Sequence, residues 1–514
     1  MSRFNINNIF DFLARKSNRV KKLKDADIIP IGRTSSSNIT GFAPFGIRYE
    51  DLKKEFGSSA GGGAEFAGLY ENRVAIIDPI NGDDVAAEFG RVDIPFKAYA
   101  GGGGNSTSPA EERVLTKINN WELENGVLTQ YRRALVILRP GIYASENLAL
   151  RNYVDLYCMP GVVFKGSTSI TTAYGVGRDG AVEARVLGHA IYDDTDEPLS
   201  EKVIFVTVTG DNVDLHIEMD RINSMTNPIT VLGNNGNFTF VCNSVDTKSL
   251  TSNCGITVRG YGGTANFTIR EYIKAYHRTW NFRLGAKSVV VNCPESYLIE
   301  GNFYGANFKM AIQVDQWLST GSIKFNGDLI STDPVNWGSI AATLNTNNGN
   351  GPIEINGNIY GGINRAIYIG SSGGNPTVKI NGNVSSDELP IQLTVGTTIF
   401  KNSSLLNTNV ENATTPIAAI SGSAKAYFQD CLLYNGADIT SGVDITSLSA
   451  QVYFYNCLHS GIGTNGWFIF ASNVGTTVQI HNTRSNRDLN PNVSDVLTPT
   501  GFIFDANLIT PNFI

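Results

Sequence analysis

Charge, histidine and cysteine are all scarce in this chain. Only 17% of its 514 residues are charged, five are His and six are Cys. No Cys-x-x-Cys pair occurs, so no zinc-ligand spacing is present. None of the five His (189, 216, 277, 459, 481) lies in a Ser or Cys pattern suited to nucleophilic catalysis. These absences argue against a zinc protein and against a Ser or Cys hydrolase.

Long apolar runs are also missing. No run approaches the about 18 residues of a membrane-spanning helix, and the N-terminus lacks the apolar core of a signal peptide. We therefore expect no membrane span and no export signal, and a protein that is made inside a cell.

Glycine is abundant, with 53 residues, and part of it recurs in a repeated phrase. The phrase Asn-Gly-polar-apolar occurs at Asn326–Leu329, Asn356–Ile359 and Asn381–Val384, and Glu300–Phe303 resembles it. The glycines of these copies are 26, 30 and 25 residues apart. A second phrase, Tyr-Phe-x-polar-Cys-Leu, occurs at Tyr427–Leu432 and again at Tyr453–Leu458. Repetition at this period is typical of a solenoid, in which each unit buries its apolar side against the next.

The repeats alternate apolar and polar residues with period two, which indicates strands with one inward face and excludes helical repeats. Coils of roughly 22 to 30 residues would hold two or three short strands each, with Asn-Gly pairs at the corners. We therefore predict a mainly β chain that folds as a parallel β-helix. Equivalent side chains then stack about 4.8 Å apart. We expect Asn326, Asn356 and Asn381 to hydrogen-bond along the axis rather than to bind a ligand.

The first 33 residues form a basic arm. They contain eight Lys or Arg and three Asp, whereas the whole chain has a net charge of −7. Within the arm, Ile6, Ile9, Phe10 and Leu13 have the i, i+3, i+4, i+7 spacing of an apolar stripe on a short helix. Three interpretations stay open: the helix packs on its own domain, it docks on another protein, or it contacts a membrane or nucleic acid.

The remaining chain divides into four segments. Residues 34–107 form a small mixed region with two glycine-rich stretches. Ser108 is a suitable N-cap, followed by Pro109 in the first turn. We predict a capping helix and lead-in over residues 108–134, the β-helix over 135–487, and a C-terminal cap or tail over 488–514.

The entry to the coil carries a more specific resemblance. Asp93-Ile94-Pro95-Phe96, the helix after Ser108 and the strand Leu135–Leu138 with Pro140-Gly141-Ile142-Tyr143 resemble the start of a known fold. It is the pectate-lyase-like right-handed β-helix of bacteriophage tailspikes and related fibre proteins. The resemblance implies a right-handed coil whose open end is covered by the helix. It also implies a homotrimer on a virion, with other virion structural proteins and a host-surface glycan or receptor as partners.

Candidate catalytic residues are few. Glycoside hydrolysis needs two carboxylates about 5 to 9.5 Å apart, and Glu300, Asp315 and Asp328 are candidates on neighbouring coils. The alternative is that these are solvated charges. The acidic run Asp193, Asp194, Asp196 and Glu197 lacks the Gly and terminal Glu of a calcium loop, which favours an exposed loop. We predict no metal and no cofactor.

One segment is rich in aromatic and cationic side chains: Tyr276, His277, Arg278 and Trp280. Such a composition suits stacking on sugar rings or contact with a protein. The alternative is an insert packed between coils. No nucleic-acid module is visible, and the acidic coil would repel phosphate.

The pattern as a whole favours a bacteriophage virion appendage, a tail or head fibre or spike. Its N-terminal region would dock to the particle, and its β-helix would present a host-attachment surface. A polysaccharide depolymerase, either a lyase or a hydrolase, is an alternative, because this fold serves both roles. A bacterial surface solenoid that binds polysaccharide is a third interpretation, disfavoured by the missing export signal.

Overall fold

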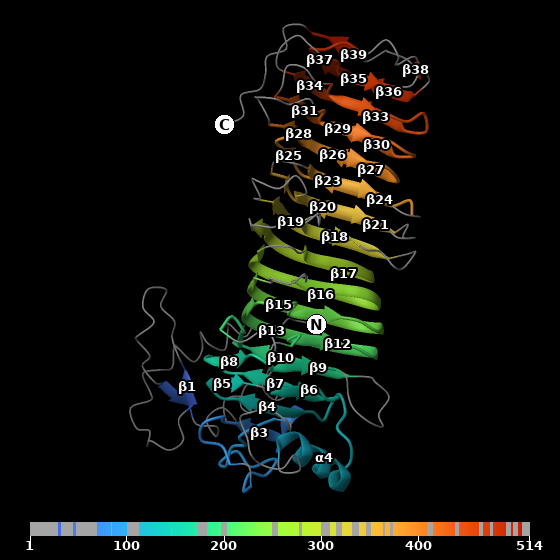
Figure 1. Cartoon of the computed structure of the whole chain (residues 1–514). Helices are drawn as coiled ribbons and strands as arrows, with labels where there is room; N and C mark the ends of the chain where they lie inside the picture. Colours follow the sequence, from blue (N-terminus) through green and yellow to red (C-terminus); the bar gives the residue numbers. More distant parts are fainter. Residues whose placement is uncertain are drawn as a thin grey trace.

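The structure is a computed structural model of the whole chain. It describes residues 29–31, 45–47, 69–83, 85–99, 113–144, 146–172, 182–196, 203–248, 255–276, 280–299, 309–314, 321–331, 339–345, 351–362, 365–370, 374–408, 415–436, 441–461, 466–472, 476–489, 495–496 and 502–505. The described chain is mainly β, and its strands wind into a long parallel β-helix (Figure 1). The predicted fold class is confirmed.

Each full coil contributes strands to three parallel sheets. Sheet 1 contains β3 (Val74–Ile77), β4 (Ala134–Leu138), β7 (Val154–Cys158), β10 (Glu183–Gly188), β13 (Asp211–Ser224), β15 (Asn234–Thr247), β16 (Ile256–Tyr276), β17 (Trp280–Ile299), β19 (Ser322–Ser331), β21 (Pro352–Asn356), β24 (Thr377–Asn381), β27 (Thr397–Lys401), β30 (Lys425–Gln429), β33 (Gln451–Tyr455), β36 (Thr477–His481) and β38 (Asp495–Val496). The long strands β13, β15, β16, β17 and β19 bend through a corner and continue into sheet 2.

The other two sheets follow the same order along the axis. Sheet 2 contains β5 (Gly141–Ala144), β8 (Val162–Lys165), β11 (Ile191–Asp193), the second parts of the long strands, β22 (Ile359–Tyr360), β25 (Val384–Ser386), β28 (Ser404–Asn407), β31 (Leu432–Asn435), β34 (Leu458–Gly461), β37 (Thr483–Ser485) and β39 (Phe502–Phe504). Sheet 3 contains β6 (Asn147–Ala149), β9 (Ser169–Thr171), β12 (Val206–Val208), β14 (Ile229–Val231), the first parts of β16 and β17, β18 (Lys309–Val314), β20 (Ser339–Asn345), β23 (Arg365–Gly370), β26 (Leu389–Leu393), β29 (Ala418–Ile420), β32 (Val443–Ile445) and β35 (Ile469–Ala471). Apart from the column, β1 (Ile29–Ile31) and β2 (Phe45–Ile47) form a separate antiparallel pair.

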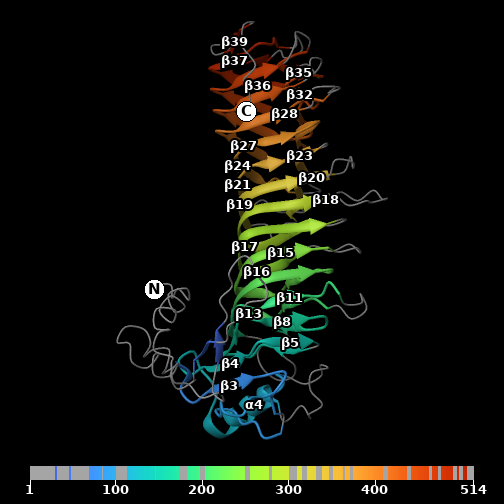
Figure 2. The same ribbon diagram turned by 90° about the vertical axis from the view of Figure 1, so that its left-hand side faces the viewer.

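The core runs along the axis because alternate residues of each strand point inward. In β33, Val452 and Phe454 are fully buried, while the alternate residues Gln451, Tyr453 and Tyr455 are half-buried. Phe454 stacks on Phe428 of the previous coil with ring centroids 4.9 Å apart, and Phe428 stacks on Phe400 at 5.2 Å. Burial of one such side chain contributes about 1.5 to 3 kcal/mol. The result is a narrow straight column in both views (Figures 1 and 2).

The predicted asparagine ladder is present at the corner between sheets 1 and 2. Asn356 donates its side-chain N–H to Oδ1 of Asn326 at 2.8 Å, and Asn381 donates to Asn356 at 2.7 Å. Below them, Asn326 donates to Asn292 at 2.7 Å. These amides satisfy one another along the axis, so the structural interpretation of Asn326, Asn356 and Asn381 is confirmed.

The same ladder corrects one part of the repeat alignment. The register pairs Asn326 with Asn292 and pairs Asp328 with Glu295. The phrase at Glu300–Phe303 is therefore not equivalent to the copy at Asn326, because β17 has already passed through sheet 2 before residue 300. A near-constant spacing in the sequence does not identify equivalent positions here, because the coils differ in length. Successive ladder residues are 34, 30 and 25 positions apart.

Glycine after the ladder asparagine is required by close contact between coils. Gly357 has φ 157°, and a Cβ added there would overlap the carbonyl oxygen of Gly327 in the coil below. In the later coils, Asp430, Asn456 and Asn482 adopt left-handed φ values of 54°, 53° and 47° at the same corner. Asn and Asp tolerate this conformation better than other non-glycine residues.

A helix covers the N-terminal end of the column. α4 (Val114–Asn125) buries Val114 and Ile118 (Figure 1). Its Glu122 forms an ion pair with Arg151 in the turn before β7, and both side chains are buried. The helix begins at Val114, and its N-cap is Arg113, whose backbone is extended. The prediction of Ser108 as the N-cap is therefore wrong, and Ser108 itself lies outside the described residues.

Parallel backbone pairing between strands extends past both predicted limits of the β-helix. β3 pairs in parallel with β4, so residues from the predicted mixed region form the first strand of sheet 1. At the other end, β38 and β39 continue sheets 1 and 2 beyond residue 487. Neither segment repeats the Asn-Gly phrase, and only hydrogen bonding to a neighbouring coil assigns them to the solenoid.

A buried ionic network fixes the segment around β3 to the coil. Arg133 donates to both carboxylate oxygens of Asp155 at 2.7 and 2.6 Å, and a further N–H reaches Glu183 at 2.6 Å. The hydroxyl of Tyr70 donates to Asp155 at 2.5 Å. The side chains of Arg133 and Asp155 are 1% and 0% exposed. This bidentate pair is well satisfied, as buried charges must be.

The core becomes polar near the C-terminal end. In sheet 2, one inward column reads Leu405, Leu433 and then His459. His459 is fully buried, its Nδ1 lies 2.8 Å from the Ser485 hydroxyl, and its ring stacks on Phe468 with centroids 4.7 Å apart. Among the described residues, its Nε2 has no hydrogen-bond partner.

Candidate functional site

The predicted docking stripe lies outside the described residues. Ile6, Ile9, Phe10 and Leu13 all belong to the segment before β1. All three interpretations of the stripe therefore stay predictions.

The predicted carboxylates are not brought together by the described structure. Glu300 and Asp315 lie outside the described residues. Asp328 lies in β19, where its Oδ1 accepts the backbone N–H of Asn358 at 2.7 Å and its Oδ2 accepts the Asn358 side chain at 3.4 Å. The carboxylate next to it on the neighbouring coil belongs to Glu295. Asp328 thus takes part in a ladder that links successive coils.

The acidic run near β11 contains both exposed and buried residues, and its Asp196 is 84% exposed and forms an ion pair with Lys165 at 3.5 Å. Asp194 is buried, and it accepts hydrogen bonds from the hydroxyls of Tyr192 and Ser224 at 3.2 and 3.0 Å. Asp193 accepts the hydroxyl of Thr195 at 2.6 Å. Glu197 lies outside the described residues. Within the described parts of the chain, no three His, Cys, Asp or Glu side chains gather as a metal site requires.

The predicted contact segment lies at the junction of two long strands. Tyr276 ends β16 in sheet 2, and Trp280 begins β17 in sheet 3. His277 and Arg278, between them, lie outside the described residues. On the outer face of sheet 2, the strands that precede this junction are β13, β15 and β16.

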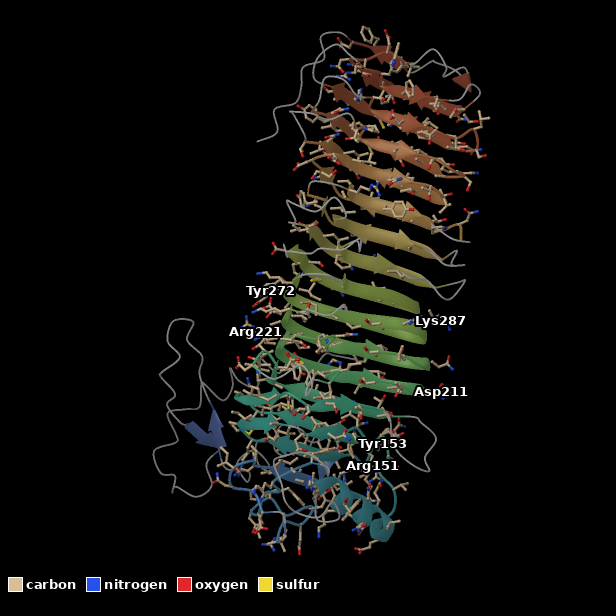
Figure 3. The ribbon with its side chains drawn as sticks, viewed as in Figure 1. Arg151, Tyr153, Asp211, Arg221, Tyr272 and Lys287 are labelled. Atoms are coloured by element: carbon tan, nitrogen blue, oxygen red, sulfur yellow. The ribbon has the colours of Figure 1, made fainter. Side chains whose placement is uncertain are left out.

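Four side chains on that face form what we call the lateral cluster: Arg221, Asp246, Tyr272 and Lys274. They come from β13, β15 and β16, on three successive coils. Arg221 approaches Asp246 at 3.7 Å, and the hydroxyl of Tyr272 donates to Asp246 at 3.4 Å. The ammonium of Lys274 lies 4.0 Å from the centroid of the Tyr272 ring. Figure 3 shows Arg221 and Tyr272 on the same side of the column, opposite Lys287.

Strand alternation explains why these residues face outward. In sheet 2 the register aligns Arg221 with Ser244 and Tyr272, and it aligns Asp246 with Lys274. Apolar residues such as Ile222, Val245 and Ile273 occupy the inward positions between them and are fully buried. The outward positions are then free to carry charge without disturbing the core.

The ion pair in the lateral cluster is open to solvent mainly on its arginine side. The side chain of Arg221 is 47% exposed and that of Asp246 is 14% exposed. A guanidinium, an ammonium, a phenol and a carboxylate on one flat face can bind hydroxyl-rich or mixed-charge ligands. They lack the arrangement of a nucleophile with its base.

Polar contacts continue around the corner toward sheet 1. Arg270 donates to Glu218 at 2.6 Å and to Asn243 at 3.0 Å, which joins three coils. His189 approaches Asp220 at 3.3 Å. The outer surface of coils β10 to β16 is therefore densely polar at this corner.

The sequence predicted a contact role for Tyr276, His277, Arg278 and Trp280 but did not indicate the lateral cluster. The alternation of Tyr272 and Lys274 is a signal in the sequence, because these two residues share one face of a strand. Arg221 and Asp246 carry no such signal. They join the cluster only through the register of coils that differ in length.

Comparison of the chain with protein-family models, with curated proteins and with solved structures finds no match. None of the helices in the described part of the chain is long and apolar enough to cross a membrane. The functional inference therefore depends on the fold and its outer faces. A parallel β-solenoid of this length suits a fibre, a spike or a polysaccharide-binding protein in general.

Proposed function

We propose that the protein is a subunit of a bacteriophage virion appendage, a tail or head fibre or spike, that attaches the particle to the host surface. The observation that carries the proposal is the continuous parallel ladder from β3 to β39, covered by α4 at its N-terminal end. In such a column each coil completes the hydrogen bonds of the coil below, so the rod is stiff along its axis. A stiff rod capped at one end suits projection from an anchor.

The other parts of the proposal follow from this arrangement. The basic arm of residues 1–33 precedes the capped end in sequence, and we assign it to docking on other virion structural proteins. The subunit acts as a homotrimer, since the flat sides of a coil can pack around a threefold axis in a closed ring. The lateral cluster contacts a host-surface glycan or receptor, and we assign the same contact role to Tyr276, His277, Arg278 and Trp280.

The docking part is tested by changing the arm. Replacement of Ile6, Ile9, Phe10 and Leu13 by Asp removes the apolar stripe but keeps the chain length. The matched control replaces Asn5, Asn7 and Asn8 by Ala, which leaves the stripe intact. Mass spectrometry of purified particles should find the control variant at the normal level and the stripe variant reduced more than tenfold. Normal incorporation of the stripe variant would refute the docking role.

The attachment part is tested on intact particles. Particles that carry Arg221→Ala and Tyr272→Ala should adsorb to host cells more slowly, whereas Lys287→Ala on the opposite side should have no effect. Incubation with isolated host polysaccharide separates binding from cleavage. An unchanged polymer size supports an adhesin, and a falling polymer size would make the protein a depolymerase. Recovery of the protein from cell surfaces but not from particles would favour the non-viral solenoid.

A further inference from the structure

A second outer face, far from the lateral cluster, combines aromatic rings with side-chain amides. It lies on sheet 1, where β30, β33 and β36 follow one another near the C-terminal end of the column (Figure 1). We call Tyr427, Tyr453, Tyr455 and His481 the distal tyrosine face. All four are half-buried at outward strand positions, between fully buried residues such as Phe428, Phe454 and Ile480.

The rings of this face stack on one another along the axis. Tyr427 and Tyr453 have centroids 4.5 Å apart and planes within 5°. Tyr455 and His481 have centroids 4.9 Å apart and planes within 2°. These separations match the about 4.8 Å distance between neighbouring strands, so each ring lies across the column. Each stacked pair therefore joins ring faces from two neighbouring coils.

Amides line the same strands. Gln429, Gln451 and Gln479 occupy outward positions of β30, β33 and β36, and the Tyr453 hydroxyl donates to Gln451 at 3.0 Å. At the adjoining corner, Asn456 donates to Asp430 and Asn482 donates to Asn456, each at 3.0 Å. Burial raises the pKa of the Tyr453 hydroxyl, with smaller contributions from Tyr427 and Tyr455, so this phenol stays protonated.

The face differs in charge from the earlier coils of the same sheet. There, the equivalent central outward column contains Lys324, Glu354 and Lys379, and Lys324 approaches Glu354 at 3.5 Å. In the distal face this column contains Tyr427, Tyr453 and Gln479. The strands β33 and β36 have no Lys, Arg, Asp or Glu, and β30 has a single charged residue, the exposed Lys425 at its first position.

We propose that the distal tyrosine face binds a neutral polysaccharide that lies along the column. Hydroxyl and amide groups donate and accept hydrogen bonds, as sugar hydroxyls do. Because these hydroxyl and amide groups recur on successive coils, a linear polymer that lies along the column can form hydrogen bonds with each coil in turn. An anionic polymer would gain no ion pair on β33 and β36. This inference deepens the proposed attachment function and depends on it for its biological setting.

The experiment compares full-length variants by binding to an array of immobilised polysaccharides, both neutral and anionic. Tyr453→Ala with Tyr455→Ala removes the centre of the face. Tyr453→Phe with Tyr455→Phe keeps the rings and removes the hydroxyls. The matched control, Lys324→Ala with Glu354→Ala, changes the same sheet in earlier coils. Circular dichroism and light scattering on each variant report folding and oligomeric state.

We expect neutral polysaccharide to bind, the Ala pair to weaken binding at least tenfold, and the control to bind normally. The Phe pair should also weaken binding, because ring edges without hydroxyls lose their hydrogen bonds. Normal binding by the Phe pair would refute this hydrogen-bonding role. Equal binding by the Ala pair and the wild type would refute the distal site while leaving the attachment function intact. Binding of anionic polymers alone, or of none, would refute the neutral-polysaccharide assignment. A changed oligomeric state in the Ala pair would instead assign the face to contact between copies.

Discussion

Acid should loosen the last coils of the β-helix, and His459 should be the residue responsible. Desolvation lowers the pKa of this imidazole from 6.5 to about 3, with a further contribution from the nearby Arg487 guanidinium. The folded protein therefore keeps His459 neutral at pH values where the unfolded chain binds a proton. The contribution of neutral His459 to the free energy of unfolding is fully present above pH 6.5. It is lost as the pH falls from 6.5 toward 3, because the unfolded chain then binds a proton that the folded protein does not.

The size of the effect follows from the two pKa values. Between pH 8 and pH 5, a shift from 6.5 to about 3 lowers the free energy of unfolding by about 2 kcal/mol. This corresponds to an about 30-fold rise in the open population of the coils that contain His459. The loss should be local, because each coil of a solenoid contacts only its neighbours. Amides of β34 to β37 should respond, while those of β7 to β10 should not.

Hydrogen exchange at the two pH values, corrected for intrinsic exchange rates, measures this opening. The test variant is His459→Leu, because the same inward column already contains Leu405 and Leu433. It should abolish the additional opening at pH 5. The matched control, His481→Gln, changes a half-buried outward His in β36 and should keep the wild-type response. An equal response in wild type and His459→Leu would refute the reasoning.

Three further predictions concern the coil and its base. Gly357→Ala should lower the unfolding free energy by more than about 2 kcal/mol, since the new Cβ overlaps a carbonyl oxygen of the coil below; urea denaturation measures this, and a neutral effect would contradict the close contact. Asn356→Ala should cost about 1 to 2 kcal/mol, because two ladder hydrogen bonds are lost; thermal melting against the exposed control Lys379→Ala checks it. Asp155→Ala should cost about 3 to 5 kcal/mol by leaving Arg133 buried without its main partner; unchanged protection of β3 and β4 in hydrogen exchange would show that the network does not hold this end.

The fold could be predicted because the β-helix repeats its chemistry. Period-two alternation defines strands, and the recurrent Asn-Gly phrase marks the corner where Asn326, Asn356 and Asn381 stack. A ladder places like residues above like residues, so the repeat in the sequence is also a repeat in space. The strands Val74–Ile77 and Phe502–Phe504 could not be predicted in this way, because neither segment resembles the repeated phrases.

The sequence by itself determined a parallel β-helix, its asparagine ladder and its inward apolar face. Only the tertiary structure decided which coil positions are neighbours, because the loops between strands vary in length and the register is set by backbone hydrogen bonds. That register moved Glu295 beside Asp328, where the sequence had suggested Glu300. It also joined Arg221, Asp246 and Tyr272 on one outer face. The order of residues in the chain determines which side chains each coil has. Backbone hydrogen bonding between coils determines which of these side chains become neighbours on an outer face.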